Sequence, residues 1–243
     1  MKENRLIYFI ASFAALIVKI FYGTADSDAL VWILAPVSWC VKILGGITFE
    51  YVSHVGYVSH AYRFIIAPSC SGVRFLILTF LMLIVSFTHD LDTQRKKIHW
   101  FAFSVGFSYL ATVIVNAIRI TISIYLPVFL TEKELLSGWL TEKRLHTMIG
   151  TTIYFSFLFV IYFMAERICT KIFGASSGAK SASRGKYLGI PIFCYVVMVL
   201  VLPFLSRLYH NQWEGFGQYA LLVIGICAVI ILFFALITRR AEV

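Results

Sequence analysis

Long apolar segments alternate with short polar ones along the chain, a pattern typical of a polytopic membrane protein. A weaker apolar segment, Leu30–Leu44, contains Pro36 and Lys42 and ends at two glycines. We expect it to form an interfacial or re-entrant helix on the outer side. Six other segments are long and apolar enough to cross a bilayer: Leu6–Tyr22, Ser71–His89, Ile98–Ile118, Thr147–Ala165, Tyr187–Ser206 and Tyr219–Thr238.

Basic residues predict the orientation of these spans, because cytoplasmic loops are enriched in lysine and arginine. With six crossings, all basic groups lie on the cytoplasmic side and both termini are inside. If Leu30–Leu44 crosses as well, one group is misplaced, so whether it crosses stays open. The groups precede the first span, follow the second, fill the loop after the fourth and end the chain: Lys2, Arg5, Arg95–Lys97, Arg167, Lys171, Lys180, Arg184, Lys186, Arg239 and Arg240.

The segment Ile47–Ala67 is rich in β-branched and aromatic residues around Gly56. We expect an outer hairpin there, in which the repeated Tyr-Val-Ser-His at 51–54 and 57–60 forms the two strands. Two histidines in such a repeat are weak evidence for zinc, so a metal site is not predicted.

Composition agrees with an all-α membrane protein and excludes a soluble one. Of 243 residues, 60% are hydrophobic, and the mean hydropathy is +0.86. The net charge of +9 is concentrated in short loops, which indicates membrane orientation and contact with anionic lipid rather than nucleic-acid binding. The five cysteines have neither metal-ligand nor disulfide spacing, and we predict no cofactor. The N-terminal apolar run lacks a small-residue cleavage site and is expected to be a retained helix.

We therefore expect one membrane-embedded domain over residues 1–243. Residues 1–172 form a helix bundle, 187–243 form a C-terminal transmembrane hairpin, and 173–186 join them. That connection is rich in glycine, alanine, serine and lysine, which is typical of a flexible linker.

Candidate chemistry lies at the outer ends of three predicted spans. Cys70 stands in Pro68-Ser69-Cys70-Ser71-Gly72, directly before the second span. The amino end of a helix favours a thiolate, which is the nucleophilic form of cysteine. Arg119 ends the third span, one turn after Asn116, and His146 begins the fourth. The predicted topology brings these residues to one depth.

Each of these residues has a chemical use. Cys70 can attack a carbonyl carbon, and His146 can take and return the proton. Arg119 can hold a substrate carboxylate or stabilise an oxyanion. Asn116 can orient the arginine or donate a hydrogen bond itself. Arg74, one turn after Cys70, either faces the same cavity and favours the thiolate or pairs with a neighbour.

Each residue also has a simpler interpretation. A buried cysteine usually packs as a small hydrophobe, an arginine at a span end can reach lipid headgroups, and His146 follows a polar stretch that favours exposure. The hypothesis of catalysis rests on the three residues together. Between Arg119 and His146, residues 121–144 suggest an amphipathic outer element, which either covers the site or is an ordinary interfacial helix.

At these residues the chain resembles the exosortase/archaeosortase family of membrane cysteine transpeptidases. The resemblance covers about residues 30–165 and rests on Ala-Pro-Ser-Cys-Ser-Gly at 67–72, Asn-Ala-Ile-Arg at 116–119 and His146. With Trp32-Ile33-Leu34-Ala35-Pro36, the context is most similar to the exosortase K subgroup.

The resemblance implies an enzyme of a bacterial plasma membrane whose site faces outward. Its partners would be membrane-anchored secreted proteins with a C-terminal sorting helix and a basic tail. Cys70 would be the nucleophile, Arg119 an essential cation and His146 the acid/base, with Asn116 in support. The residues alone leave hydrolysis and transpeptidation open, because the first half-reaction is the same. A non-catalytic membrane scaffold or small transporter is the alternative from another class.

Overall fold

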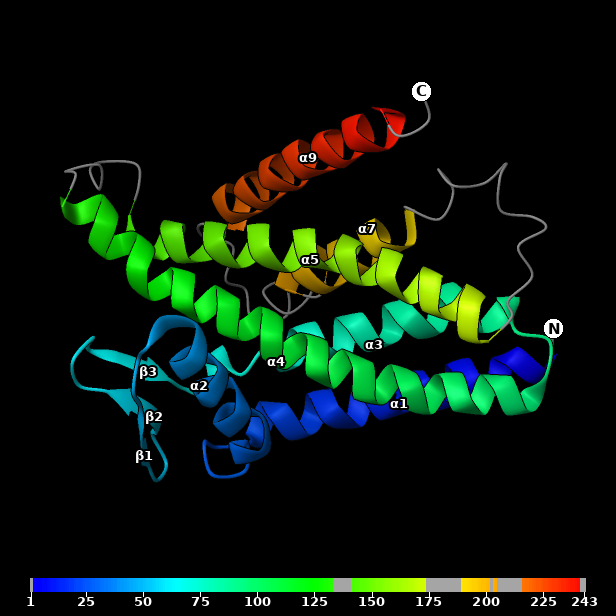
Figure 1. The fold of residues 1–243 in the computed structure, drawn as a ribbon, viewed down its shortest axis with the longest axis horizontal. Coiled ribbons are helices and arrows are strands. Elements are labelled where there is room, and N and C mark those ends of the chain that lie inside the picture. Colours follow the sequence, from blue (N-terminus) through cyan, green and yellow to red (C-terminus); the bar gives the residue numbers. More distant parts are fainter. Residues whose placement is uncertain (1, 133–140, 174–188, 202, 205–215, 241–243) are drawn as a thin grey trace.

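The computed structural model describes residues 2–132, 141–173, 189–201, 203–204 and 216–240. Five helices in these ranges are long and apolar enough to cross a membrane, which confirms an all-α polytopic membrane protein. In chain order the first four run along the long axis of the molecule in alternating directions, and the fifth runs in the same direction as the fourth (Figure 1). Their bounds are α1 Lys2–Thr24, α3 Val73–Phe87, α4 Gln94–Glu132, α5 Glu142–Ile172 and α9 Phe216–Arg240.

The fifth of the six expected spans is represented by a shorter element. α7 (Gly189–Val196) continues into η4, a π-helical stretch over Val197–Val201. Together they form an apolar helix that is shorter than a full crossing. The predicted span Tyr187–Ser206 lies outside the described residues at 187–188, 202 and 205–206. The same holds for residues 174–186 of the expected linker over 173–186.

The helix expected over Leu30–Leu44 is present as α2 (Val31–Gly45). Its 15 residues extend over about 22 Å, which is less than the ~30 Å hydrocarbon core of a bilayer. α2 packs against α4 at one end of the bundle (Figure 1) and buries Ile33, Leu34 and Val37. Its length fits the expectation of a helix that does not cross, which stays a prediction.

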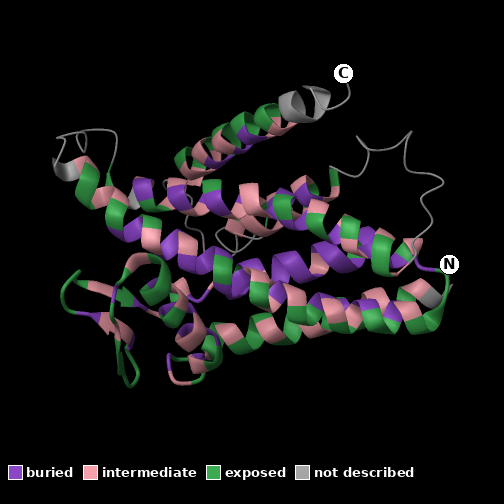
Figure 2. Cartoon of the chain, viewed as in Figure 1, coloured by how far each residue is buried: buried purple, intermediate pink, exposed green. Residues whose placement is uncertain are grey.

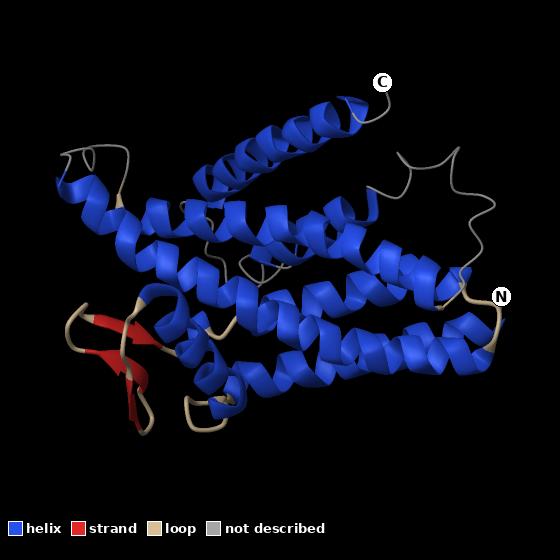
Figure 3. Cartoon of the chain, viewed as in Figure 1, coloured by secondary structure: helices blue, strands red, loops and turns tan. Residues whose placement is uncertain are grey.

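Three short antiparallel strands lie beside α2, at the end of the bundle that we call the sheet end (Figure 3). They are β1 (Glu50–Val52), β2 (Gly56–Ser59) and β3 (Phe64–Ile66), in the order β1-β2-β3. Tyr51 lies opposite Tyr57, so the expected hairpin of the two Tyr-Val-Ser-His repeats is confirmed. The third strand was not expected.

α3 is the most deeply buried helix, whereas α1 and α9 expose much of their apolar surface (Figure 2). Side chains such as Phe80, Met82 and Leu83 of α3 belong to a core shared with α5 and α9. Phe9 on α1 is 69% exposed and Leu221 on α9 is 73% exposed. Large exposed apolar faces of this kind indicate contact with lipid.

α4 is longer than the sequence predicted. The third span was expected to end at Ile118, but the helix continues to Glu132 and contains Pro127. Up to Glu132, the amphipathic outer element expected over residues 121–144 is a continuation of α4 rather than a distinct element; its part over 133–140 lies outside the described residues. Thr141 caps α5 by accepting a hydrogen bond from the backbone N–H of Arg144.

Candidate active site

Cys70 lies in a tight turn between the sheet and the most buried helix. β3 ends at Ile66, and η1 (Pro68–Cys70) is a single 3-10 turn in which the backbone N–H of Cys70 donates to the carbonyl of Ala67 at 2.8 Å. α3 begins only at Val73, so Cys70 stands just before the helix rather than in its first turn. The thiol is half-buried.

Gly72 allows this turn to lie against α4. Its φ of +76° is in the left-handed region, which side chains other than glycine adopt only with strain. A Cβ at this position would lie 3.0 Å from Cγ of Asn116 and 3.1 Å from Cγ2 of Thr112. Both the backbone conformation and the close approach therefore require glycine.

Side chains from two helices hold the turn in place. The side-chain amide of Asn116 donates to the carbonyl of Cys70 at 2.6 Å, and the hydroxyl of Tyr22 at the end of α1 donates to the carbonyl of Pro68 at 3.3 Å. Asn116 is fully buried and has no hydrogen bond to Arg119 among the described residues. Its contacts are those of a residue that positions Cys70.

Tyr154 on α5 joins these residues, and sequence reasoning missed it. Its hydroxyl donates to Oδ1 of Asn116 at 2.7 Å. Its ring stacks on Phe75 with centroids 4.6 Å apart. The guanidinium of Arg119 lies over the same ring, 5.4 Å from the centroid, a distance typical of a cation–π contact. One side chain thus contacts both Asn116 and Arg119.

Arg119 is a buried cation without an ionic partner among the described residues. The side chain is only 7% exposed, and its Nε and Nη2 atoms have no hydrogen-bond partner in that part of the chain. Buried polar groups are almost always hydrogen-bonded, and a buried charge is normally paired. The guanidinium is therefore arranged as an unfilled binding group.

A cavity of about 330 Å³ brings most of the predicted site together. Arg119 and His146 line it, and so do Ser69 and Gly72, which flank Cys70 on either side. His146 is exposed in the first turns of α5. No hydrogen bond links the Cys70 thiol to the His146 ring in the described structure. Such contacts are often long in a substrate-free enzyme.

Arg74 also lines this cavity and is exposed. No acidic side chain among the described residues forms an ion pair with it. Of the two interpretations left open by the sequence, the geometry favours the one in which Arg74 faces the cavity. A further part of the wall, which we call the C-terminal wall, comes from the C-terminal part of the chain, through Tyr195, Met198 and Tyr219.

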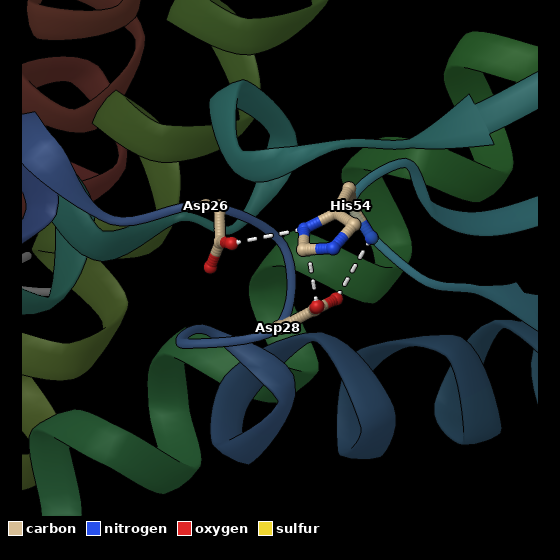
Figure 4. A group of neighbouring side chains, drawn as sticks. All are labelled: Asp26, Asp28 and His54. Atoms are coloured by element: carbon tan, nitrogen blue, oxygen red, sulfur yellow. Dashed lines mark hydrogen bonds and ion pairs between the residues drawn. The ribbon is translucent and has the colours of Figure 1, made fainter.

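The only candidate metal ligands in the described part of the chain lie away from this cavity. Asp26 and Asp28 precede α2, and His54 occupies the turn between β1 and β2 (Figure 4). Glu50 is the only carboxylate close to His54 in the sequence, whereas the fold brings Asp26 and Asp28 to it, because the loop before α2 packs against the hairpin. The candidate ligand atoms of the three residues lie within 4.8 Å of one another.

This cluster is explained by anchoring of the hairpin. Asp28 accepts hydrogen bonds from the Tyr51 hydroxyl, from the Ser53 hydroxyl at 2.9 Å and from the backbone N–H of His54 at 2.8 Å. These donors, led by Tyr51, lower the pKa of Asp28 to about 2. The same bond raises the pKa of Tyr51 to about 12. The donors already occupy the oxygens that a cation would need.

The fold and the site define a polytopic membrane protein in which a cysteine turn, a buried unpaired guanidinium and a histidine surround one cavity. The family model described as transmembrane exosortase matches residues 5–164. The chain therefore belongs to the transmembrane exosortase family, which is known for cysteine transpeptidase activity. No curated protein and no solved structure matches the chain. The family match ends within α5, so α7 and α9 lie outside it.

Proposed function

We propose that this protein is a membrane cysteine protease/transpeptidase that cleaves C-terminal sorting signals of secreted proteins at the outer boundary of a bacterial plasma membrane. The observation that carries the proposal is the buried guanidinium of Arg119. It has no hydrogen-bond partner at Nε or Nη2 among the described residues and faces a cavity shared with His146 and the residues beside Cys70. Membership of the exosortase family supports the same chemistry.

The proposed reaction begins when the Cys70 sulfur attacks the scissile carbonyl and its proton passes to His146. Arg119 stabilises the negative charge that develops on the carbonyl oxygen. The C–N bond then breaks, His146 protonates the leaving amine, and the acyl group remains on Cys70 as a thioester. An acceptor nucleophile attacks the thioester, gives its proton to His146 and releases the thiolate. Water as acceptor gives hydrolysis, and an amine or hydroxyl gives transfer.

The proposed orientation places the sheet end outside and both termini in the cytoplasm. Figure 1 shows the start of α1 at the end of the bundle opposite the sheet. Arg95 and Lys96, at the start of α4, lie at that opposite end too. Basic residues mark the cytoplasmic side, which supports an outward site. A substrate anchored by one helix would then present its cleavage site at the depth of Cys70, which raises its effective concentration.

The finer assignment to the exosortase K subgroup remains a prediction from the sequence motifs. A scaffold or small transporter remains the alternative function. It does not need a cysteine in the turn before α3, and the two hypotheses differ sharply in what a change at Cys70 does.

The test compares strains whose only copy of the protein is wild type, Cys70→Ala, Cys70→Ser or Cys40→Ala. Mass spectrometry of envelope proteins would define their C-termini. We expect precursors that retain a C-terminal helix and basic tail to accumulate in both Cys70 variants. Cys40 is half-buried on α2, and the Cys40→Ala control should process normally. Equal C-termini in all four strains, at equal amounts of inserted protein, would refute the proposed function.

The proposed orientation has its own test. A membrane-impermeant maleimide is added to intact cells that carry a variant with Cys70 as its only cysteine. Labelling from outside, slowed by removal of His146 or Arg119, is expected. Labelling only after permeabilisation would show that Cys70 faces the cytoplasm and would refute the proposed orientation.

A further inference from the structure

We call the cavity lined by Arg119, His146 and Arg74 the reactive cavity. A second cavity, of about 770 Å³, lies beside it. We call it the outer cavity because it lies toward the sheet end. The two cavities meet at His146 and Thr147, which line both. The wall combines the segment at β3 with α4 and α5, through Tyr62, Phe64, Ser123, Pro127, Val128 and Ile149. The volume lies within the range of small-ligand sites, ~300–1,000 Å³.

The wall of the outer cavity offers hydrogen-bonding groups that suit a polypeptide backbone. The Ser123 hydroxyl is buried and has no partner among the described residues. Pro127, four residues later, has no backbone N–H, so the Ser123 carbonyl also loses its usual helical donor. A buried serine hydroxyl without a partner among the described residues is a favourable contact for peptide groups.

The adjoining strand adds a further backbone surface. β3 is hydrogen-bonded to β2 on one side and is the last strand of the described sheet. An edge strand can hold an extended peptide through main-chain hydrogen bonds. β3 also leads into the Cys70 turn after one residue, Ala67. A peptide along this edge would therefore be directed to the thiol.

The lining of the outer cavity specifies the character of its ligand. Its described residues include no aspartate, glutamate, lysine or arginine, and most are apolar or aromatic. The two cations, Arg74 and Arg119, line the reactive cavity instead. The outer cavity thus fits an uncharged extended segment, with the charged groups of the site beyond it.

We propose that the outer cavity binds the extended peptide on the amino side of the scissile bond. This inference rests on the proposed function. Along α4, Ser123 and Pro127 lie one and two turns beyond Arg119, toward the sheet end. The secreted part of the substrate has to leave the site toward the outside. Its membrane helix, on the carboxyl side, has to lie in the bilayer, on the side of the reactive cavity away from the sheet end.

The test traps an uncleaved precursor in the Cys70→Ala variant and uses photo-crosslinking. p-Benzoylphenylalanine replaces either Val128 or Phe129, which are 52% and 53% exposed on the same helix. Only Val128 lines the outer cavity. We expect position 128 to crosslink the precursor on the amino side of its cleavage site, and position 129 not to do so. Crosslinks from 128 only to the sorting helix, to lipid or to an acceptor molecule would overturn the proposal.

A second measurement separates failure of the peptide site from failure of the proposed function. Val128→Trp should narrow the outer cavity and lower kcat/KM for the same precursor on the order of tenfold, mainly through KM, whereas Phe129→Trp should not. Alkylation of Cys70 by iodoacetamide should be equally fast in both variants. Absence of precursor in Cys70→Ala cells would refute the proposed function itself. Precursor that accumulates, with normal cleavage by Val128→Trp, would refute only the peptide site.

Discussion

Tyr154→Phe isolates a hydrogen bond between α5 and Asn116, the residue that holds the cysteine turn. The substitution keeps the ring, and with it the stacking on Phe75 and the contact with Arg119. It removes only the hydroxyl that donates to Oδ1 of Asn116 at 2.7 Å. Asn116 then keeps its bond to the Cys70 carbonyl but loses the partner that fixes the orientation of its amide.

The expected cost follows from the burial of the acceptor. Asn116 is 0% exposed, and a buried acceptor left without a partner costs about 1–3 kcal/mol. Hydrogen bonds between membrane helices are weaker, averaging about 0.6 and reaching about 1.7 kcal/mol in double-mutant cycles. Because the bond is short and its acceptor is fully buried, we expect a coupling energy of about 1–2 kcal/mol between Tyr154 and Asn116. A loss of that size in Cys70 positioning would slow the reaction about 5–30-fold.

The assay is a double-mutant cycle on the free energy of unfolding in micelles, with Tyr154→Phe, Asn116→Ala and the double variant. Removal of the Tyr154 hydroxyl should cost almost nothing once Asn116 is alanine. Tyr109 is a matched control, because its hydroxyl donates to the carbonyl of Trp32 at the same distance of 2.7 Å. Tyr109→Phe and Asn116→Ala should be additive. Additive effects of Tyr154→Phe and Asn116→Ala would refute the linkage, as would an unchanged alkylation rate of Cys70 in Tyr154→Phe.

Three further predictions concern other residues. Gly72→Ala should destabilise the fold by about 1–2 kcal/mol from backbone strain alone and slow Cys70 alkylation, whereas Gly106→Ala, with open space around its position, should do neither. Arg119→Met should abolish precursor processing but not lower the thermal stability, because it removes a buried unpaired charge; a large fall in stability would show that Arg119 has a structural partner. The pKa of Asp28 is lowered to about 2, below the ordinary value of about 3.9, so its anchoring of the hairpin should be complete above about pH 4 and lost as the pH falls toward 2. Hydrogen-exchange protection of the His54 amide should show this loss, and Asp28→Asn should show it already at neutral pH.

The sequence was sufficient for features that depend on local composition. Apolar length predicted the helix that follows Cys70 and the helices that carry Arg119 and His146, because a bilayer demands long apolar segments. It failed after Ile118, where an apolar and then charged composition suggested an amphipathic outer element, whereas α4 continues to Glu132. Pro127 lies in this continuation, since a proline removes one backbone donor and need not end a well-packed helix.

Features that depend on contacts between distant residues could not be predicted. Tyr154 stands in an apolar span, where a tyrosine looks like ordinary core, and its role depends on a partner 38 residues away. Likewise, the backbone N–H of His54 donates to Asp28, 26 positions earlier. Neither pair has a spacing that a helix or a hairpin would bring together. Three tyrosine hydroxyls, from Tyr22, Tyr51 and Tyr154, anchor these parts of the fold, and only their geometry separates them from the other aromatic residues.

The residues of the proposed site and of the wall around it differ in their relation to the family. Cys70, Arg119 and His146 fall inside the family match over residues 5–164, whereas Tyr195, Met198 and Tyr219 of the C-terminal wall fall outside it. The C-terminal wall contributes no cysteine, histidine or arginine among the described lining residues. Under the proposed function, bond breaking and substrate fitting would therefore fall to different parts of the chain. Changes in the C-terminal wall would then alter which substrate is accepted and leave the reactive groups in place.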